Sequence, residues 1–209
     1  MIPLSSRRWK HLGKRERMVV MLSAMYASGR KQQADRVIRE GISLPGVTKR
    51  FLEELFIHLS LVLGFPAMLD GLERLRRLGF SASSSQRIPA SGAAGMKPLS
   101  RVYGRQTGKL LRNLQQLHPE VRTWILRDVY GRVFTRTGMR LRERELINVV
   151  VLAVQGLDRQ LQSHVRGALR AGISRNALRE AFSMTGSIVG RPKIAAKYRP
   201  LVVSLRKNS

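Results

Sequence analysis

Two side chains with acid–base capacity flank the apolar stretch "ELINVVVLAVQGLDRQLQSH" (145–164). Glu145 precedes the apolar run and His164 follows it. A positioned imidazole can serve as a general acid or base near neutral pH, and a carboxylate beside it can orient the ring or exchange protons with a substrate. We therefore take Glu145 and His164 as candidate catalytic residues.

Both residues also have a structural explanation. Glu145 stands near the start of an expected helix, where the helix dipole favours an acid without any catalytic role. His164 lies on an expected helix over 159–171, one residue before an apolar set, at the edge of a core. A third histidine, His58, lies between leucines in "FLEELFIHLSLVLG" (51–64), and we interpret it as structural. The residues alone leave catalysis and helix packing both open.

The elements that carry these residues are predicted to be helices throughout. Apolar residues recur at intervals of three and four, and one helix is expected between Ser174, as N-cap, and Gly190. Another is expected after Pro119, at its first helical position. The stretch "SASSSQRIPASGAAGMKP" (81–98) has no helical period, which indicates a flexible linker between a domain at 1–80 and a second at 99–209.

Short matches between the two parts predict an internal duplication. The triplet "GIS" occurs at 41–43 and again at 172–174, and each is followed by a helix that ends in "VLGFP" (62–66) or "IVGRP" (188–192). A common helical unit would explain both matches. If the triplets are equivalent, the first copy carries about five extra residues at 44–50.

The segment "YGRVFTRTGMRLRERELINVVVLAVQGLDRQLQSHVRGALRAGIS" (130–174) resembles the carboxymuconolactone decarboxylase and alkylhydroperoxidase D-like superfamily. Residues 19–43 and 64–75 resemble it more weakly. The resemblance implies an all-α alkylhydroperoxidase D-like fold with two tandem degenerate repeats. It also implies assembly as a homo-oligomer, a trimer or a hexamer.

In the peroxidase branch of this superfamily, a Glu is followed by a Cys-x-x-Cys pair and a His. Glu145 and His164 match the Glu and the His, while Leu157 and Gln160 stand where the cysteines would be. The chain has no cysteine, so it lacks the thiolate that attacks peroxide and is not a thiol peroxidase on its own. The decarboxylase branch relies on acid–base residues, so that chemistry stays open.

The first copy lacks the pair. With the triplets as anchors, Lys14 and Gln33 take the positions of Glu145 and His164. A shift of two residues brings Glu16 into the carboxylate position, but no histidine follows at the required distance. We expect at most one site per chain.

Charge separates this chain from ordinary globular proteins. It has 39 Lys and Arg against 13 Asp and Glu, a net charge of +26, which favours an anionic partner. Aromatic residues make up only 6%, so contact with nucleic acid should be to phosphates and duplex shape. The candidate contacts are Arg7, Arg8, Lys10, Lys14, Arg15, Arg17, Arg140, Arg142 and Arg144.

Three hypotheses follow. The first is a thiol-free enzyme acting on a small anionic substrate. The second is a non-catalytic, basic relative that binds RNA or DNA phosphates within a ribonucleoprotein or another assembly. The third is a homo-oligomeric structural protein that binds acidic protein surfaces. No metal or nucleotide motif is present, so no cofactor is expected.

The apolar runs are too short for a membrane-spanning helix, so no membrane insertion is expected. We expect a cytoplasmic location, or an organellar matrix if the basic first 18 residues act as a transit peptide.

Overall fold

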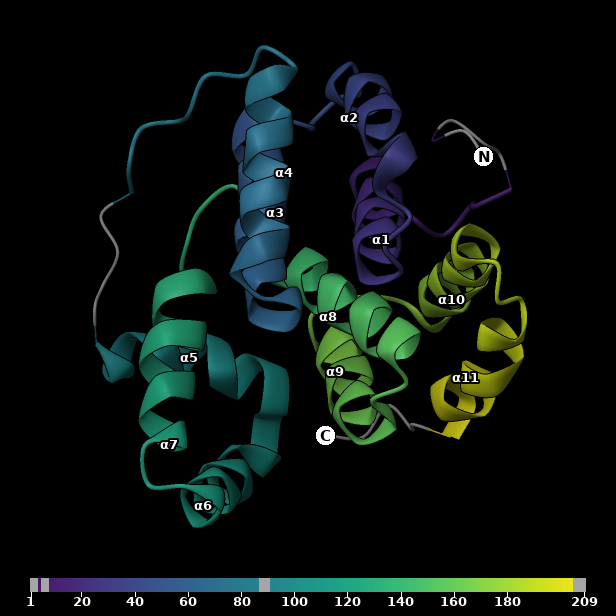
Figure 1. Ribbon diagram of the computed structural model, residues 1–209. Coiled ribbons are helices and arrows are strands. Elements are labelled where there is room, and N and C mark those ends of the chain that lie inside the picture. The colour runs from purple at the N-terminus through teal and green to yellow at the C-terminus, as the bar shows by residue number, and fades with distance from the viewer. Residues whose placement is uncertain (1–3, 5–7, 87–90, 205–209) are drawn as a thin grey trace.

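The computed structural model describes Leu4, residues 8–86 and residues 91–204. The described residues form helices and connecting turns without a strand, which confirms the all-α prediction (Figure 1). None of these helices is long and apolar enough to cross a membrane. The first part of the chain contains α1 (Lys14–Ala27), η1 (Lys31–Gln33), α2 (Ala34–Ile42), α3 (Lys49–Leu63) and α4 (Phe65–Arg77).

The second part begins with α5 (Gly92–Tyr103), η2 (Gly104–Gln106), α6 (Thr107–Leu117), α7 (Val121–Trp124) and the π-helical segment η3 (Ile125–Val133). It continues with α8 (Leu141–Gln155), α9 (Asp158–Arg170), α10 (Arg175–Val189) and α11 (Lys193–Ser204).

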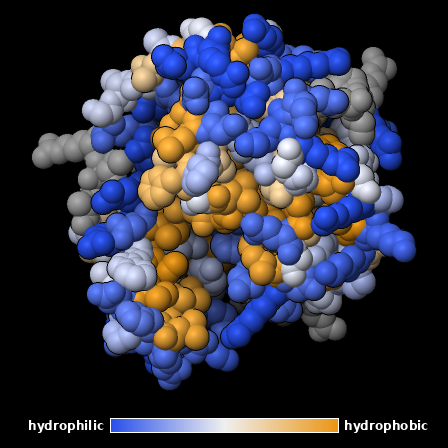
Figure 2. Space-filling model, in the orientation of Figure 1, coloured by the Kyte–Doolittle hydropathy of each residue, from blue (hydrophilic) through white to orange (hydrophobic). Residues whose placement is uncertain are grey.

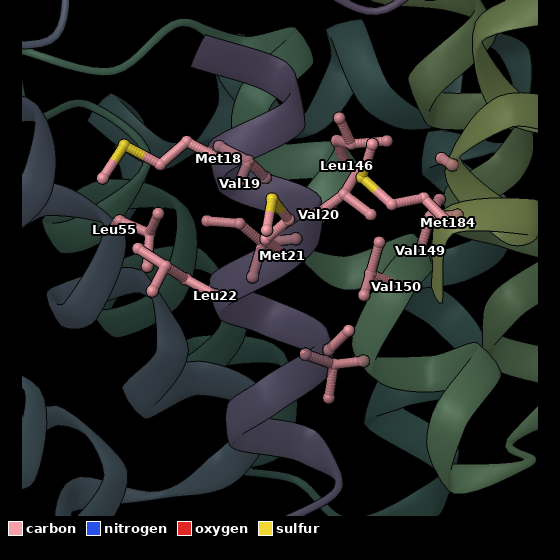
Figure 3. Close-up of a cluster of buried hydrophobic side chains, with 14 of the residues drawn as sticks. Met18, Val19, Val20, Met21, Leu22, Leu55, Leu146, Val149, Val150 and Met184 are labelled. Atoms are coloured by element: carbon pink, nitrogen blue, oxygen red, sulfur yellow. The ribbon is translucent and has the colours of Figure 1, made fainter. Parts of the chain in front are cut away.

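Two helices, α1 and α8, pack against each other at the centre of the main core. Each is also covered by a helix from the other part of the chain, because α3 packs on α8 and α10 packs on α1. Outer helices complete the body, with α2 on α1, α9 on α8, α4 on α3 and α11 on α10. Figure 3 shows aliphatic and methionine side chains filling the space around the central helices.

The starts of the two central helices are tied to each other by crossed ion pairs. In both, the first helical residue is followed by the same three residues, "RER" at 15–17 and at 142–144. Arg15 donates to Glu143 with two bonds of 2.8 Å, and Arg142 pairs with Glu16. Each glutamate also caps its own helix by accepting a backbone N–H three residues earlier, at 2.8 Å. These matching caps place Arg15, Glu16 and Arg17 in the same positions as Arg142, Glu143 and Arg144.

The prediction that the "GIS" triplets are equivalent is wrong. Gly41 lies inside α2, whereas Gly172 follows α9 with a φ of 94°. The triplet's serine ends a helix in the first part, at Ser43, and begins one in the second part, at Ser174. A three-residue match does not fix register, because the helices it joins end at different points.

Capping residues give a register without the five-residue insertion. Thr48 and Ser174 both accept a backbone N–H at the start of a helix of 15 residues, α3 or α10. Gly64 and Gly190 end these helices at positive φ, and a proline follows each two residues later. The shared "RER" residues make Met18, not Lys14, the counterpart of Glu145, and the caps Thr48 and Ser174 make Ile38, not Gln33, the counterpart of His164. Duplication as the origin of this correspondence stays a prediction.

The first helices of the second part form a smaller lobe with its own core. It consists of α5, α6, α7 and η3, and its buried residues are Leu99, Val102, Leu111, Tyr130 and Phe134. Its first helix begins at Gly92, inside the stretch that the sequence predicts to be irregular. Ser91 caps this helix, and Gly95 lets it pack directly against the backbone of η3, where a Cβ would overlap the carbonyl oxygen of Leu126.

The helix expected after Pro119 forms, but it widens into a π-helix after one turn. Its end shows the π pattern, since Phe134 donates its backbone N–H to Val129 O, five residues earlier, at 3.1 Å. π-Helical segments are rare and frequently accompany functional sites. Here the segment carries Tyr130 beside the candidate residues.

Candidate active site

Glu145 and His164 meet at the contact between α8 and α9. The carboxylate of Glu145 is fully buried, and its Oε2 lies 2.9 Å from Nδ1 of His164, whose side chain is 17% exposed. The two candidate residues are therefore in direct contact. Their helices are joined by a tight turn at Gly156, which has a φ of 73° and is followed by α9 at Asp158.

A glycine on α9 makes room for the carboxylate. A Cβ on Gly167 would lie 2.5 Å from Oε2 of Glu145 and 2.7 Å from Cγ1 of Val102. No side chain larger than hydrogen fits there without displacing one of them. Gly167 is thus part of what lets Glu145 face His164.

Two buried polar residues extend the pair into the core. Asn148, one turn after Glu145, places Nδ2 3.4 Å from Oε1 of Glu145 and Oδ1 3.0 Å from Nε2 of His58. His58 is fully buried on α3 and packs edge-on against Phe134. Burial, with the nearby positive charge of Arg144, lowers the pKa of His58 to about 3, so its ring is neutral.

The distances assign the proton between Glu145 and His164. Asn148 Nδ2 also lies 3.3 Å from Nδ1 of His164, but an amide nitrogen is only a donor. Since Nδ1 is much closer to the carboxylate, we assign Nδ1–H as a donor to Glu145. Nε2 then carries the lone pair of the neutral ring, and no described residue forms a hydrogen bond to it.

Two tyrosines of the small lobe complete the surroundings. The Tyr103 ring lies edge-on to His164 with centroids 6.3 Å apart, and Tyr130 lies 6.4 Å beyond Tyr103. Burial raises the pKa of Tyr103 to about 12, and the negative charge of Glu145 adds to the shift. Burial likewise raises the pKa of Tyr130 well above its ordinary value. Both phenols are therefore neutral hydrogen-bond donors at physiological pH.

Sequence reasoning missed Asn148 and both tyrosines. The signal for Asn148 was present, because it is the one polar residue within the apolar run "LINVVVLAV" (146–154). Nothing in the sequence brings Tyr103 to His164, because that contact depends on the lobe.

A buried ion pair stands on the other side of His58. Arg144 and Glu54 both have fully buried side chains, and Arg144 Nη2 lies 3.0 Å from Glu54 Oε2. Arg136 reaches the same carboxylate at 2.8 Å. Burial lowers the pKa of Arg144, and the charge of Glu54 opposes that shift.

Only some of the residues predicted to contact an anion are exposed in the structure. Arg144 faces the core, so the prediction that it meets an external polymer is wrong. Arg15 and Arg142 hold the crossed ion pairs, and Arg17 donates to backbone carbonyls of the N-terminal segment. Arg7 lies outside the described residues. The exposed members of the predicted set are Arg8, Lys10, Lys14 and Arg140.

Known proteins share the part of the chain that holds this site. Residues 122–201 match the model of the carboxymuconolactone decarboxylase family. A 4-carboxymuconolactone decarboxylase from Acinetobacter baylyi is 25% identical over 99 residues, which cover 47% of this chain and 74% of that protein. The family match runs from α7 to α11 and includes both Glu145 and His164.

Proposed function

We propose, from the match of residues 122–201 to the model of the carboxymuconolactone decarboxylase family, that the chain performs acid–base chemistry of the decarboxylase or lyase type on a small anionic substrate. The observation that supports the proposal is the 2.9 Å contact between Glu145 and His164, in which Nε2 of the ring has no hydrogen-bond partner among the described residues. That nitrogen is the reacting atom of the proposed mechanism.

The proposed step needs one proton donor and one charge stabiliser. When the carbon–carbon bond to a substrate carboxylate breaks, carbon dioxide leaves and the electron pair stays on the substrate as an enolate. Nε2 of His164 first takes up a proton from solvent, and the resulting imidazolium delivers this proton to the enolate carbon, which returns the ring to its neutral Nδ1–H form. The Glu145 carboxylate holds the ring through Nδ1–H and stabilises its positive charge, in the way a buried acid orients a catalytic histidine. We assign the neutral phenol of Tyr103, whose ring lies edge-on to His164, as the donor to the enolate oxygen.

The test uses 4-carboxymuconolactone, the substrate in the name of the Acinetobacter protein. Carbon dioxide release by the full chain should fall by about 10²- to 10⁴-fold in Glu145→Gln and in His164→Asn, because each removes one member of the proton path. The matched control is His118→Asn, which changes an exposed histidine stacked on Trp124. Full turnover in either site variant would exclude the assignment.

The proposal also covers two expectations from the sequence. With no thiolate available, alkyl hydroperoxide and a dithiol reductant should give no peroxidase turnover. We further propose a homo-oligomer, and exposed apolar side chains support it. Figure 2 shows apolar residues gathered across the middle of one face. The large apolar side chains exposed among the described residues include Phe65, Leu69 and Leu157, at 69%, 59% and 43%. Light scattering that gives the monomer mass at micromolar concentration would contradict it.

A second candidate function, binding to nucleic acid phosphates, is favoured by the charge of the small lobe. Residues 91–119 contain no Asp or Glu, and all their basic side chains are exposed on α5, η2 and α6. None of these side chains forms a salt bridge with a described residue. We call this set the α5–α6 basic strip: Lys97, Arg101, Arg105, Lys109 and Arg112.

Salt titration tests this candidate. Affinity for duplex RNA should fall linearly in a log–log plot, with a slope of about −0.7 to −0.9 per phosphate neutralised. A triple variant of the strip, R101Q/R105Q/K109Q, should reduce the slope by about two to three units. The variant R8Q/K10Q/K14Q removes the same charge from the N-terminal set and serves as the matched control. No binding by the wild-type chain at ~0.15 M salt would exclude this function.

A further inference from the structure

His58 is an unusual residue for its position. It is fully buried, its Nε2 contacts Asn148, and its Nδ1 is a buried nitrogen without a hydrogen-bond partner among the described residues. An unpaired polar atom in a core is costly, and native proteins retain few of them. In the register set by the helix caps, the corresponding places are taken by Met184 for His58 and Met21 for Asn148. The scaffold therefore does not need a polar pair here for packing.

The orientation of the Asn148 amide explains the pair. The side of the amide that faces Glu145 must be the NH₂ group, because a carbonyl oxygen 3.4 Å from a carboxylate oxygen would be repelled. The carbonyl then faces His58, whose ring must place its single proton on Nε2 to donate at 3.0 Å. Both bonds run in one direction, from His58 to Asn148 to Glu145.

This chain of donors has a consequence for His164. Asn148 covers Oε1 of Glu145, and Oε2 is left as the acceptor for the imidazole. The amide N–H also approaches Nδ1 of His164, at 3.3 Å, but the Oε2 atom of Glu145 is closer, at 2.9 Å, and a lone pair on Nδ1 would place two acceptors against each other there. The favourable arrangement therefore directs the amide N–H to Oε1 and Nδ1–H to Oε2.

We propose that His58 and Asn148 are positioning residues that hold the Glu145 carboxylate so that His164 carries its proton on Nδ1 and presents Nε2 to the substrate. The catalytic part of this inference rests on the proposed function, while the proton assignment can be measured without any substrate. Neither His58 nor Asn148 touches the reacting atoms.

The experiment combines a double-mutant cycle with nitrogen NMR. The full chain, labelled with ¹⁵N, is compared with His58→Met, Asn148→Met and the double variant H58M/N148M, which copies the Met184 and Met21 arrangement. Each single variant leaves one buried polar side chain without its partner and should lower the urea midpoint of unfolding. The double variant removes both polar side chains and should unfold near the wild-type midpoint. The readouts are the ¹⁵N shifts of the two His164 ring nitrogens, which distinguish the tautomers, and turnover.

A positioning role predicts that the double variant changes the tautomer of His164 without lowering the stability of the protein. The double variant should unfold near the wild-type midpoint, yet its His164 should show a mixture of tautomers and kcat should fall by ~10- to 100-fold, with little change in KM. A purely structural pair predicts wild-type tautomer and kcat in the double variant, and that result would overturn the inference. The variant His58→Gln keeps an N–H donor and should retain the wild-type tautomer, so it serves if the methionine variants do not fold.

The two proposals fail in different ways. If wild-type His164 is the Nδ1–H tautomer but no lactone is decarboxylated, the positioning inference stands and the proposed function fails. If wild-type His164 is already the Nε2–H tautomer, the positioning inference fails whatever the activity.

Discussion

The surroundings of α1 and α8 differ in chemistry although the two helices begin with the same capped "RER" residues. Glu145 on α8 faces a glycine of α9, Gly167, and Met18 on α1 faces a glycine of α2, Gly41, in the same manner. Where α3 and α8 bring His58 to Asn148, α10 and α1 carry Met184 and Met21, shown among aliphatic side chains in Figure 3. The comparison teaches that a notch opposite a glycine accepts either a thioether or a carboxylate, and that the neighbouring residues decide whether the occupant can move protons.

The largest effect should come from the ion pair that only the α8 side buries completely. Arg144→Met leaves the Glu54 carboxylate in the core with a weaker partner set, and loss of one member of a buried pair costs about 3–5 kcal/mol. Urea unfolding measures it. The equivalent change on α1, Arg17→Met, should cost less because Arg17 is only partly buried and donates to backbone carbonyls. Equal losses of stability in Arg144→Met and Arg17→Met would mean that the buried ion pair of Arg144 contributes no more than the backbone contacts of Arg17.

The two glycine notches should respond unequally to a methyl group. In Gly167→Ala, the new Cβ meets the carboxylate of Glu145 and the methyl of Val102, so we expect destabilisation of about 1–3 kcal/mol and reduced turnover. In Gly41→Ala, the Cβ meets the end of Met18, a flexible side chain that can turn away at lower cost. Thermal or urea unfolding of both variants tests this, and a greater loss in Gly41→Ala would contradict it.

Acid should lower the free energy of unfolding because His58, buried beside α8, takes up a proton only in the unfolded chain. Its pKa is about 3 in the folded chain, against about 6.5 for an unfolded histidine. Between these values the unfolded chain binds a proton that the folded chain does not. The contribution of His58 therefore lowers stability as pH falls through that window, by up to about 1.4 kcal/mol per unit. His58→Met removes this contribution, so the difference in slope between wild type and variant, from urea unfolding at several pH values, measures it. Identical slopes would show that His58 titrates normally.

The smallest change in stability should follow when the polar residues around α8 are replaced by the apolar residues found at the corresponding positions around α1. The variant H58M/E145M/N148M/H164I places the residues of the α1 side at all four polar positions. Replacement of a complete buried polar set by apolar residues is often neutral or stabilising, so we expect a change within about 1–2 kcal/mol. Carbon dioxide release should be abolished. A stability loss above about 4 kcal/mol would mean that packing around α8 requires the polar set.

How far the sequence predicts this molecule depends on the distance over which its parts interact. Helical periodicity and capping residues predict the fold, since both act within a few turns. Glu145 and His164 are separated by 19 residues in a helix–turn–helix unit, so their meeting follows from local geometry and the family resemblance. The contact of Asn148 with His58 joins residues 90 apart on different helices, and no local pattern specifies it.

Two predictions failed for the same physical reason. The equivalence of the "GIS" triplets and the absence of a helix from residues 92–98 are both predicted from residue type alone, whereas residues 81–86 lack regular structure as predicted. Whether a glycine lies within a helix or after it depends on where the cap forms, as Gly41 and Gly172 show. In the same way, the Gly- and Ala-rich residues after Ser91 become helical because they pack against the η3 backbone.

The crossed pairs between Arg15 and Glu143 and between Arg142 and Glu16 also bear on how the molecule unfolds. Each central helix obtains part of the hydrogen bonding at its start from the other, so neither start is complete when the other has melted. Separate opening of α1 or α8 would break both pairs at once, and the two helices therefore open as one cooperative unit. Their backbone amides should therefore exchange with deuterium at a common free energy of opening.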